Sequence, residues 1–487
     1  NWSRTLLLAG ACTVASAVSG IAPAQAETLK EALAQAYLTN PSLQVARANL
    51  RATDENVPIR RADALPSLNG TVGYTEYLYQ SGSNPGPDRQ GNGQVTLGVP
   101  VYAGGSVRNG IRAAETRVLA GRADLRGSES GLFSRVVAAY MDVIQNEAIV
   151  SLSRNNVQVL QVNLQATSDR FQIGDLTRTD VAQSQARLAL AQGDLRTAEA
   201  NLIRARENYV ALVGAAPTNL EVPPALPGLP ASPDDAVDVA LQNNPDLLGA
   251  KERATAAGID IRVAEAARLP RIDLTAGGTY SDYLGSLPGS MAAITPGSSR
   301  AATAGVRATI PLFQGGRPAA QVRQAQARSA AALEQAIGTE RDVISQVRAA
   351  YSSWRASSAI IASTQSAVDA ASLSLEGVRA ENTVGNRTIL DILNAQQELL
   401  RAQVQLVTAR RNAYVAGFTV LAAMGRAEAR DLNLEGTGPL YDPVANYDRV
   451  RGNVWDWSHN PDPVAVSTRT VDIPAQGGDI PDQRQAR

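Results

Sequence analysis

Two aspartates at equivalent positions of a repeated stretch are the first candidates for a functional site. Asp391 lies within Gly385–Gln396 (GNRTILDILNAQ), and Asp180 lies within a weaker copy, Gly174–Gln185 (GDLTRTDVAQSQ). Glycine, threonine and aspartate recur in both copies at a separation of 211 residues. Glycine permits a tight turn, and threonine and aspartate are frequent at helix starts, where a carboxylate also balances the helix dipole. The pattern therefore predicts the turn of a helical hairpin, with either ordinary turn chemistry or an acidic functional site.

Other reactive side chains are scarce. Cys12 and His459 are the only cysteine and histidine, and they lie close to opposite ends of the chain. A zinc site needs several such ligands, and the sequence shows neither a phosphate-binding loop nor a paired-carboxylate cleft. The formal net charge of -1 gives no global attraction for nucleic acid. These observations predict a protein that is not an enzyme, with no cofactor, no metal site and no nucleic-acid partner.

Residues 1–26 have the features of a secretory signal peptide. An apolar run at 5–22 follows Arg4, and Ala24-Gln25-Ala26 fits a cleavage site before Glu27. Cys12 lacks the aliphatic residue three positions earlier that a lipoprotein site has, so we do not expect lipidation. No apolar run of the length that a membrane helix needs follows. An exported chain of this kind is periplasmic, secreted or an outer-membrane barrel.

The rest of the chain is a tandem repeat with constant spacing. Asn40-Pro41 recurs as Asn244-Pro245, and Val99–Gly105 (VPVYAGG) recurs as Ile310–Gly316 (IPLFQGG). Because the spacing holds across loops as well as helical stretches, we interpret the chain as two copies of one unit. The predicted divisions are a first repeat 27–214, a linker 215–232, a second repeat 233–425, and an irregular periplasmic tail 426–487.

Each repeat is predicted to hold two strands and a long helical hairpin. Period-two patterns predict strands within 67–102 and 271–313, the last of them over Thr303–Phe313. The helical hairpins are predicted at 104–214 and 316–425, with long helices from Ser106 to about Phe171 and from Arg317 to about Asn382, each roughly 100 Å long. The return helices carry heptads with one large seam and one alanine seam, which is typical of closely packed coiled coils. A helix before each strand pair, reaching to about Asp63 or Ala267, would extend the return helix to nearly the same length.

The strands admit two interpretations, a soluble half-buried sheet or part of a membrane barrel. Four strands cannot close a barrel, and an open strand edge is forbidden in lipid. If the hairpins enter a bilayer, the chain must oligomerise. Three chains would supply twelve strands, and their helical rods would close a tube below the barrel.

The sequence here resembles the TolC family of outer-membrane efflux and type I secretion channels. The resemblance covers about residues 27–425 and rests on the duplicated order, the strand-exit motifs Val99–Gly105 and Ile310–Gly316, and above all the stretch Gly385–Ala395. It implies a mainly α fold with a membrane β-barrel, in which a homotrimer forms a 12-stranded barrel in outer-membrane lipid on a periplasmic helical tunnel. The implied partners are a periplasmic adaptor and an inner-membrane ABC or RND transporter.

The resemblance also assigns roles at the hairpin tips. Asp391 matches the pore-constricting aspartate of the family, and three copies would form an acidic ring. Asn394 stands where a second aspartate is frequent, which implies a single ring and weaker cation block. Gly174 and Gly385 would form the tip turns and lie where an adaptor docks.

A gating latch is implied beside this constriction. Arg387 matches a gating arginine whose partners would be Thr179 and Asp180 on the other hairpin. Asn382 replaces the aromatic residue that commonly supports the latch. By resemblance, then, the tip would be held shut by polar and charged contacts.

Two alternatives stay open from the sequence. Within the family, the cargo is either polypeptide or small molecules, and the absence of a lipoprotein site favours protein secretion or a dual role. Outside the family, a periplasmic coiled-coil adaptor or scaffold without a membrane barrel would share the helical pattern.

Overall fold

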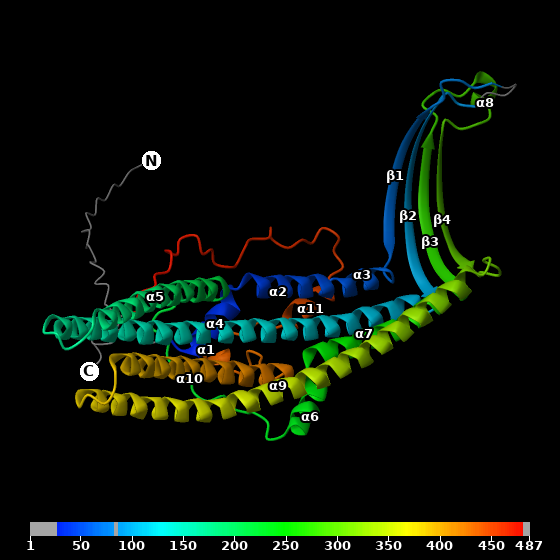
Figure 1. The fold of residues 1–487 in the computed structure, drawn as a ribbon. Helices are drawn as coiled ribbons and strands as arrows, with labels where there is room; N and C mark the ends of the chain where they lie inside the picture. Colours follow the sequence, from blue (N-terminus) through cyan, green and yellow to red (C-terminus); the bar gives the residue numbers. More distant parts are fainter. Residues whose placement is uncertain (1–26, 82–85, 481–487) are drawn as a thin grey trace, which may run out of the picture.

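The computed structural model describes residues 27–81 and 86–480. A long helical bundle makes up most of it, and a four-stranded sheet extends from one end (Figure 1). The predicted signal peptide at 1–26, with Cys12, lies outside the described residues. None of the helices in the described part is long and apolar enough to cross a membrane.

Two helices of 67 residues each run the length of the bundle, α4 (Ser106–Gln172) and α9 (Arg317–Thr383). Each turns back into a shorter helix, α5 (Arg178–Val213) or α10 (Ile389–Ala423). These bounds differ from the sequence prediction by only one or two residues. The long stretches are rich in alanine, glutamine, leucine and arginine, which favour helices, and they have no proline beyond the first turn.

Shorter helices continue the two return helices toward the sheet. In the first repeat these are α2 (Pro41–Asp54) and α3 (Asn56–Ala62), and in the second repeat α7 (Pro245–Glu265). The short helices α1 (Leu29–Thr39) and α6 (Pro233–Asn243) precede them.

A buried asparagine joins each pair of stacked helix ends. The side-chain oxygen of Asn40 accepts the backbone N–H of Ser42, and its Nδ2 donates to the carbonyl of Leu212 near the end of α5, at 2.8 Å. Asn244 caps α7 and donates to the carbonyl of Ala423 at the end of α10, at 2.9 Å. Each pair therefore forms one composite rod beside an uninterrupted helix.

The prediction of one unbroken helix up to about Asp63 was wrong. The helix breaks at Glu55, between α2 and α3. Pro58 explains the break, because it has no N–H to donate to the carbonyl of Asp54 and its ring crowds that carbonyl. In the observed structure Pro58 lies in the first turn of α3, where a proline is tolerated.

The sheet contains β1 (Ser67–Glu76), β2 (Arg89–Ala103), β3 (Arg271–Asp282) and β4 (Ser298–Thr309), all antiparallel and in that order. A short helix, α8 (Gly289–Ala292), lies in the second hairpin loop. The last strand was predicted over Thr303–Phe313, but it begins and ends earlier. Thr309 already pairs with Arg271, the first residue of β3, so the residues after Thr309 have no strand beside them. Pro311 also lacks the N–H that a ladder requires.

The register sorts the sheet into an apolar face and a polar face. Directly opposed residues share a face, so cross-strand rows can be read from the pairing. One row on the apolar face contains Leu68, Leu97, Ala276 and Ala304. The next row, on the opposite face, contains Asn69, Thr96, Gly277 and Thr303.

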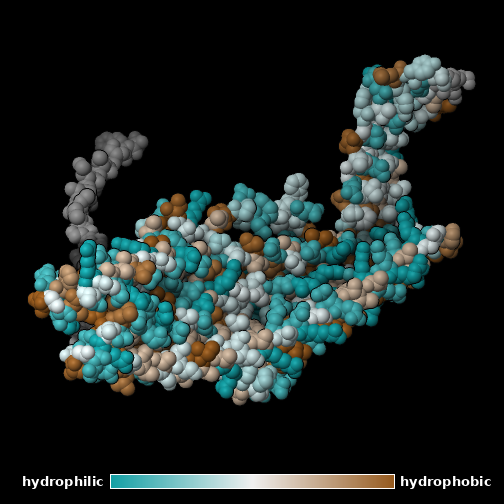
Figure 2. Space-filling view, viewed as in Figure 1, coloured by the Kyte–Doolittle hydropathy of each residue, from teal (hydrophilic) through white to brown (hydrophobic). Residues whose placement is uncertain are grey.

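The described residues leave the apolar face of the sheet largely exposed. Val72 is 94% exposed and Leu68 is 69% exposed. In Figure 2 the sheet projects away from the bundle, whose visible surface is mainly hydrophilic with scattered hydrophobic residues. The edges formed by β1 and β4 have no strand partner among the described residues. The sheet thus lacks a core of its own.

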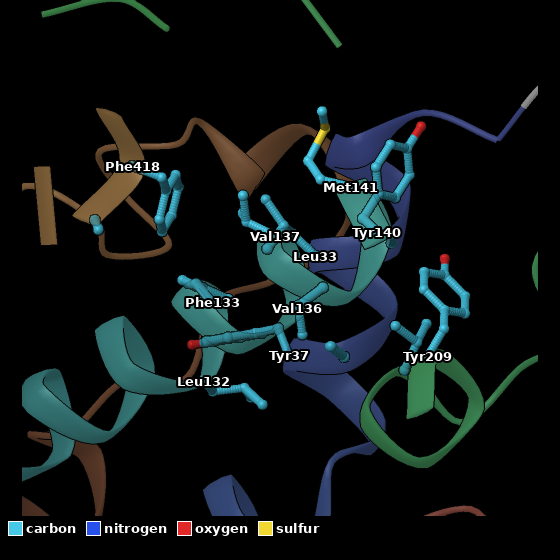
Figure 3. Close-up of a cluster of buried hydrophobic side chains, with 14 of the residues drawn as sticks. Leu33, Tyr37, Leu132, Phe133, Val136, Val137, Tyr140, Met141, Tyr209 and Phe418 are labelled. Carbon is cyan, nitrogen blue, oxygen red and sulfur yellow. The ribbon is translucent and has the colours of Figure 1, made fainter. Parts of the chain in front are cut away.

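The main core lies midway along the bundle, where α1, α4 and α5 meet (Figure 3). The hydroxyl of Tyr140 lies 2.8 Å and 2.7 Å from the carbonyl oxygens of Glu27 and Glu221, which ties the linker to α4. The Tyr209 hydroxyl donates to the carboxylate of Glu27 at 2.5 Å. Tyr351, which is equivalent to Tyr140 in the second repeat, donates to the linker carbonyl of Ala231 at 2.8 Å.

The segment after α10 is largely irregular, as predicted. Its first part is packed against the bundle, with Ala427, Ala429 and Leu434 in the main core, whereas residues 451–475 are mostly exposed. The segment includes the short elements η2 (Leu434–Thr437) and α11 (Ala445–Val450). His459 is exposed.

Candidate functional site at the hairpin tips

Both hairpin tips are built by the same backbone geometry. Gly174 and Gly385 have φ of 83° and 82°, a conformation that strains any other residue type. The N–H of the next residue, Asp175 or Asn386, donates to the carbonyl of Arg170 or Glu381, at 2.9 Å and 3.0 Å. This is the bond that commonly closes a helix C-terminus with glycine. The tips therefore match in shape.

A reciprocal capping box starts each return helix. The carboxylate of Asp391 accepts the backbone N–H of Thr388 at 2.9 Å and its hydroxyl at 2.8 Å. Asp180 accepts the same two groups from Thr177 at 2.9 Å and 2.7 Å. These bonds from threonine lower the pKa of both aspartates, because they stabilise the charged form. Each tip therefore carries a fixed negative charge at neutral pH.

The ion pairs at the two tips have opposite polarity. In the first tip Arg170 donates to Asp175 at 2.7 Å. In the second tip Glu381 stands at the position of Arg170 and accepts from Arg387 at 2.7 Å. That bond, together with the charges of Glu381 and then Asp391, raises the pKa of Arg387. The side chain of Asn382 donates to the backbone carbonyl of Arg387 at 2.7 Å and braces the turn.

The predicted latch partners lie on separate hairpins of one chain. Arg387 and Asn382 belong to the second tip, whereas Thr179 and Asp180 belong to the first turn of α5. Among the bonds of the described residues, none joins Arg387 to Thr179 or Asp180 within the chain. Arg387 instead forms an ion pair inside its own hairpin.

A polar clasp between the two hairpins was not predicted from the sequence. Arg187 on α5 donates to the side-chain oxygen of Asn394 on α10 at 2.9 Å, and also to Gln397. A small apolar cluster that includes the buried Leu160 and Leu393 lies beside it. The heptad of α5 contained the signal, since Arg187 precedes the seam residue Leu188 and occupies a position that often makes interhelical contacts.

These side chains suit charge recognition and polar contact rather than catalysis. Within the described ranges, no group of three or more His, Cys, Asp or Glu side chains is placed to hold a metal ion. Asp391 and Asp180 are committed to their capping boxes, and they present fixed charge near the exposed ends of the hairpins.

A helical bundle joined to an open, two-faced sheet is the architecture of outer-membrane channels with a periplasmic helical tunnel. The model of the family "Outer membrane efflux protein" matches residues 32–215 and 236–426. The chain belongs to this family, and it is an outer-membrane protein of the TolC type.

Individual relatives agree with this assignment. The chain is 34% identical to the outer membrane efflux protein BepC of Brucella suis over 94% of its length and 97% of the relative. It is 28% identical to TolC of Escherichia coli over 93% of its length and 90% of the relative. It is also 28% identical to the alkaline protease secretion protein AprF of Pseudomonas aeruginosa, over 63% of its length and 64% of the relative.

The fold matches solved structures as well. The Campylobacter jejuni CmeC outer membrane channel superimposes with a TM-score of 0.72 over 88% of this chain and 90% of that chain, at 18% identity. This likeness supports the tunnel-and-barrel fold.

Proposed function

We propose that the protein is a trimeric channel-tunnel that serves as a passive exit duct for a tripartite pump. The observation that carries this proposal is the open sheet, with one polar face, one exposed apolar face and two unpaired edges. A spanning sheet must close so that every backbone group is paired. Three chains of four strands give twelve, an even number of the kind found in bacterial barrels.

The duct would receive cargo from an inner-membrane ABC or RND transporter through a periplasmic adaptor. The relatives support both cargo classes, since BepC is named as an efflux protein and AprF as a secretion protein. We therefore assign type I protein secretion, drug efflux or both. The tips at Gly174 and Gly385 are the proposed docking points for the adaptor.

The periplasmic entrance would be constricted by a ring of three Asp391 carboxylates. The bonds from Thr388 lower the pKa of Asp391 and so favour its charged form, whereas repulsion among three such carboxylates would oppose full ionisation. The negative charge that the ring carries would attract cations. Asn394 lies one turn further along α10 and would add a polar but uncharged ring. Its bond to Arg187 would hold it in place at the constriction.

The latch would act between hairpins of neighbouring chains. Arg387 is exposed and forms an ion pair with Glu381. Its remaining N–H groups could donate to Thr179 and Asp180 on the first hairpin of a neighbouring chain. Asn382 would hold the backbone of Arg387 in place, because its side-chain amide donates to the carbonyl of Arg387. Exposed contacts of this type are each worth about 0–1 kcal/mol, which suits a gate that must open.

Single-channel conductance in planar bilayers tests the proposal, with wild type beside Asp391→Asn. Asparagine retains an oxygen for the cap but removes the charge. We expect stable cation-selective steps in the wild type, and loss of divalent-cation block in the variant. Asp194→Asn is the matched control, because it removes an exposed carboxylate of α5 outside the proposed ring and latch and should retain the block.

Two results would contradict the proposal at different levels. Equal divalent-cation block in wild type and Asp391→Asn would refute the acidic ring but not the channel itself. A protein that stays soluble without detergent and never inserts would instead support a periplasmic scaffold.

A further inference from the structure

The segment after α10 makes an ordered excursion toward the sheet and back. On the way out, the backbone N–H of Tyr441 donates to the hydroxyl of Tyr37 on α1 at 2.9 Å, and Asn446 donates to Asp54 at the end of α2 at 2.7 Å. On the way back, Arg206 on α5 donates to the carbonyls of Gly477 and Asp479 at 2.6 Å and 2.9 Å. Figure 1 shows this segment passing beside α2 and α3 and returning to α5.

A compact turn forms the far end of this excursion. We call residues 453–460 the tryptophan turn. The backbone N–H of Trp455 donates to the side-chain oxygen of Asn453 at 3.1 Å, and Ser458 donates back to the carbonyl of Trp455 at 3.0 Å. Two side-chain bonds close the turn further, from Asn453 to Ser458 at 2.9 Å and from Arg449 to Asn460 at 3.0 Å.

The tryptophan turn exposes its largest apolar side chains. Trp455 is 70% exposed, Trp457 is 82% exposed and Val454 between the bonded residues is 70% exposed. Leaving indole rings in water forgoes the hydrophobic stabilisation that burial would give, at about 25 cal/mol per Å² of apolar surface. An ordered turn that holds several such side chains outward is typical of a surface that meets another apolar phase.

The turn lies near the base of the membrane sheet. The guanidinium of Arg61 in α3 donates to the backbone carbonyl of Arg451 at 2.5 Å, just before the turn. α3 ends at Ala62, and β1 begins at Ser67. The turn therefore lies close to the place where the chain passes from the periplasm into the outer membrane.

From this geometry we infer that the tryptophan turn is a peripheral anchor that places Trp455 and Trp457 in the headgroup region of the periplasmic leaflet. Tryptophan is enriched at membrane–water interfaces, because its ring is largely apolar while its N–H can stay hydrated. Asp456 and His459 lie between and after the two rings, so the turn has no cationic cluster that would require anionic lipid. The anchor would fix the tail, and the α2–α3 rod bonded to it, relative to the membrane surface.

Fluorescence of the intact protein in phosphatidylcholine vesicles tests this inference. The spectrum of the variant Trp455→Ser/Trp457→Ser, subtracted from that of the wild type, isolates the emission of the pair from that of Trp2 and Trp354. We expect this emission to be blue-shifted and several-fold weaker in vesicles whose acyl chains carry bromine near the headgroup. Val464→Ser/Val466→Ser, which removes exposed apolar side chains from the returning segment, is the control and should leave that quenching unchanged.

The inference would be overturned in either of two ways. Emission quenched by aqueous acrylamide but not by bromine would place the rings in water. Emission shielded from both quenchers would place them under protein, such as a second copy of this chain. Because the readout does not involve conductance, it is independent of the proposed acidic ring.

Discussion

The asparagine joints give a sharp test of how the composite rods are held together. Asn40 is 5% exposed and does two jobs, capping α2 through its oxygen and donating to Leu212 through its amide. Asn40→Ala removes both interactions. Asn40→Ser keeps a capping oxygen but is too short to reach Leu212. The difference between the two variants separates the cap from the joint.

The magnitudes follow from the two interactions. Loss of an N-cap costs about 1 kcal/mol. A carbonyl left without its donor in a buried place costs about 1–3 kcal/mol. We therefore expect Asn40→Ala to destabilise the fold by about 2–4 kcal/mol and Asn40→Ser by about 1–3 kcal/mol.

Thermal unfolding at a fixed scan rate provides the assay. The midpoints should fall in the order wild type, Asn40→Ser, Asn40→Ala, and the Asn244 series should repeat that order in the second repeat. Asn49→Ala, at an exposed position of α2, is the control and should leave the midpoint unchanged or slightly raised, since alanine favours helices. If the serine variants unfold at the wild-type midpoint, the bonds across the joints do not contribute, and the rods are held by packing alone.

Three further predictions concern charge, the clasp and a tight turn. Burial, with Glu428 nearby, raises the pKa of Glu129 from 4.5 to about 7. The folded state thus binds this proton more tightly, so stability should fall as pH rises between those values, and Glu129→Gln should flatten that decline in the thermal midpoint. Arg187→Ala should broaden the distance distribution between spin labels on the two tips, whereas the exposed Arg204→Ala should not. Gly425→Ala should lower the midpoint more than Gly214→Ala: both pay about 1–2 kcal/mol for positive φ, but the new Cβ at 425 would lie 2.4 Å from the Asn243 carbonyl oxygen, and the one at 214 meets only threonine side chains.

The long helices and the existence of both strand hairpins could be predicted because their signals are local and periodic. Heptads and a constant repeat spacing set α4, α5, α9 and α10 almost to the residue. The end of the last strand was predicted wrongly because residues with a strand-like pattern have no neighbouring strand to pair with. Ile310, Leu312 and Phe313 look like strand residues, yet β3 begins only at Arg271, opposite Thr309, and offers them no strand to pair with.

The candidate site was only partly accessible from sequence. The glycine that recurs between helical stretches predicts the turns at Gly174 and Gly385. The Thr-x-x-Asp pattern that follows each glycine predicts the capping boxes. The clasp from Arg187 to Asn394 joins residues 207 positions apart, and no periodicity specifies which faces of two coiled hairpins will meet. The path of the tail was also hidden, because it is fixed by single bonds such as that from Arg61 to the carbonyl of Arg451.

The ion pairs at the two tips are inverted, so the tips can be told apart by their charge although they have the same shape. Glycine turns and capping boxes make the two tips alike in outline, but Arg170 in one corresponds to Glu381 in the other. In the proposed trimer, the outline would repeat six times around the axis and the charge only three times. A partner guided by outline alone could settle in two registers, one step apart. A partner that also senses charge has a single register, so duplication followed by divergence of the charged residues at the tips would set the angular alignment of the assembly.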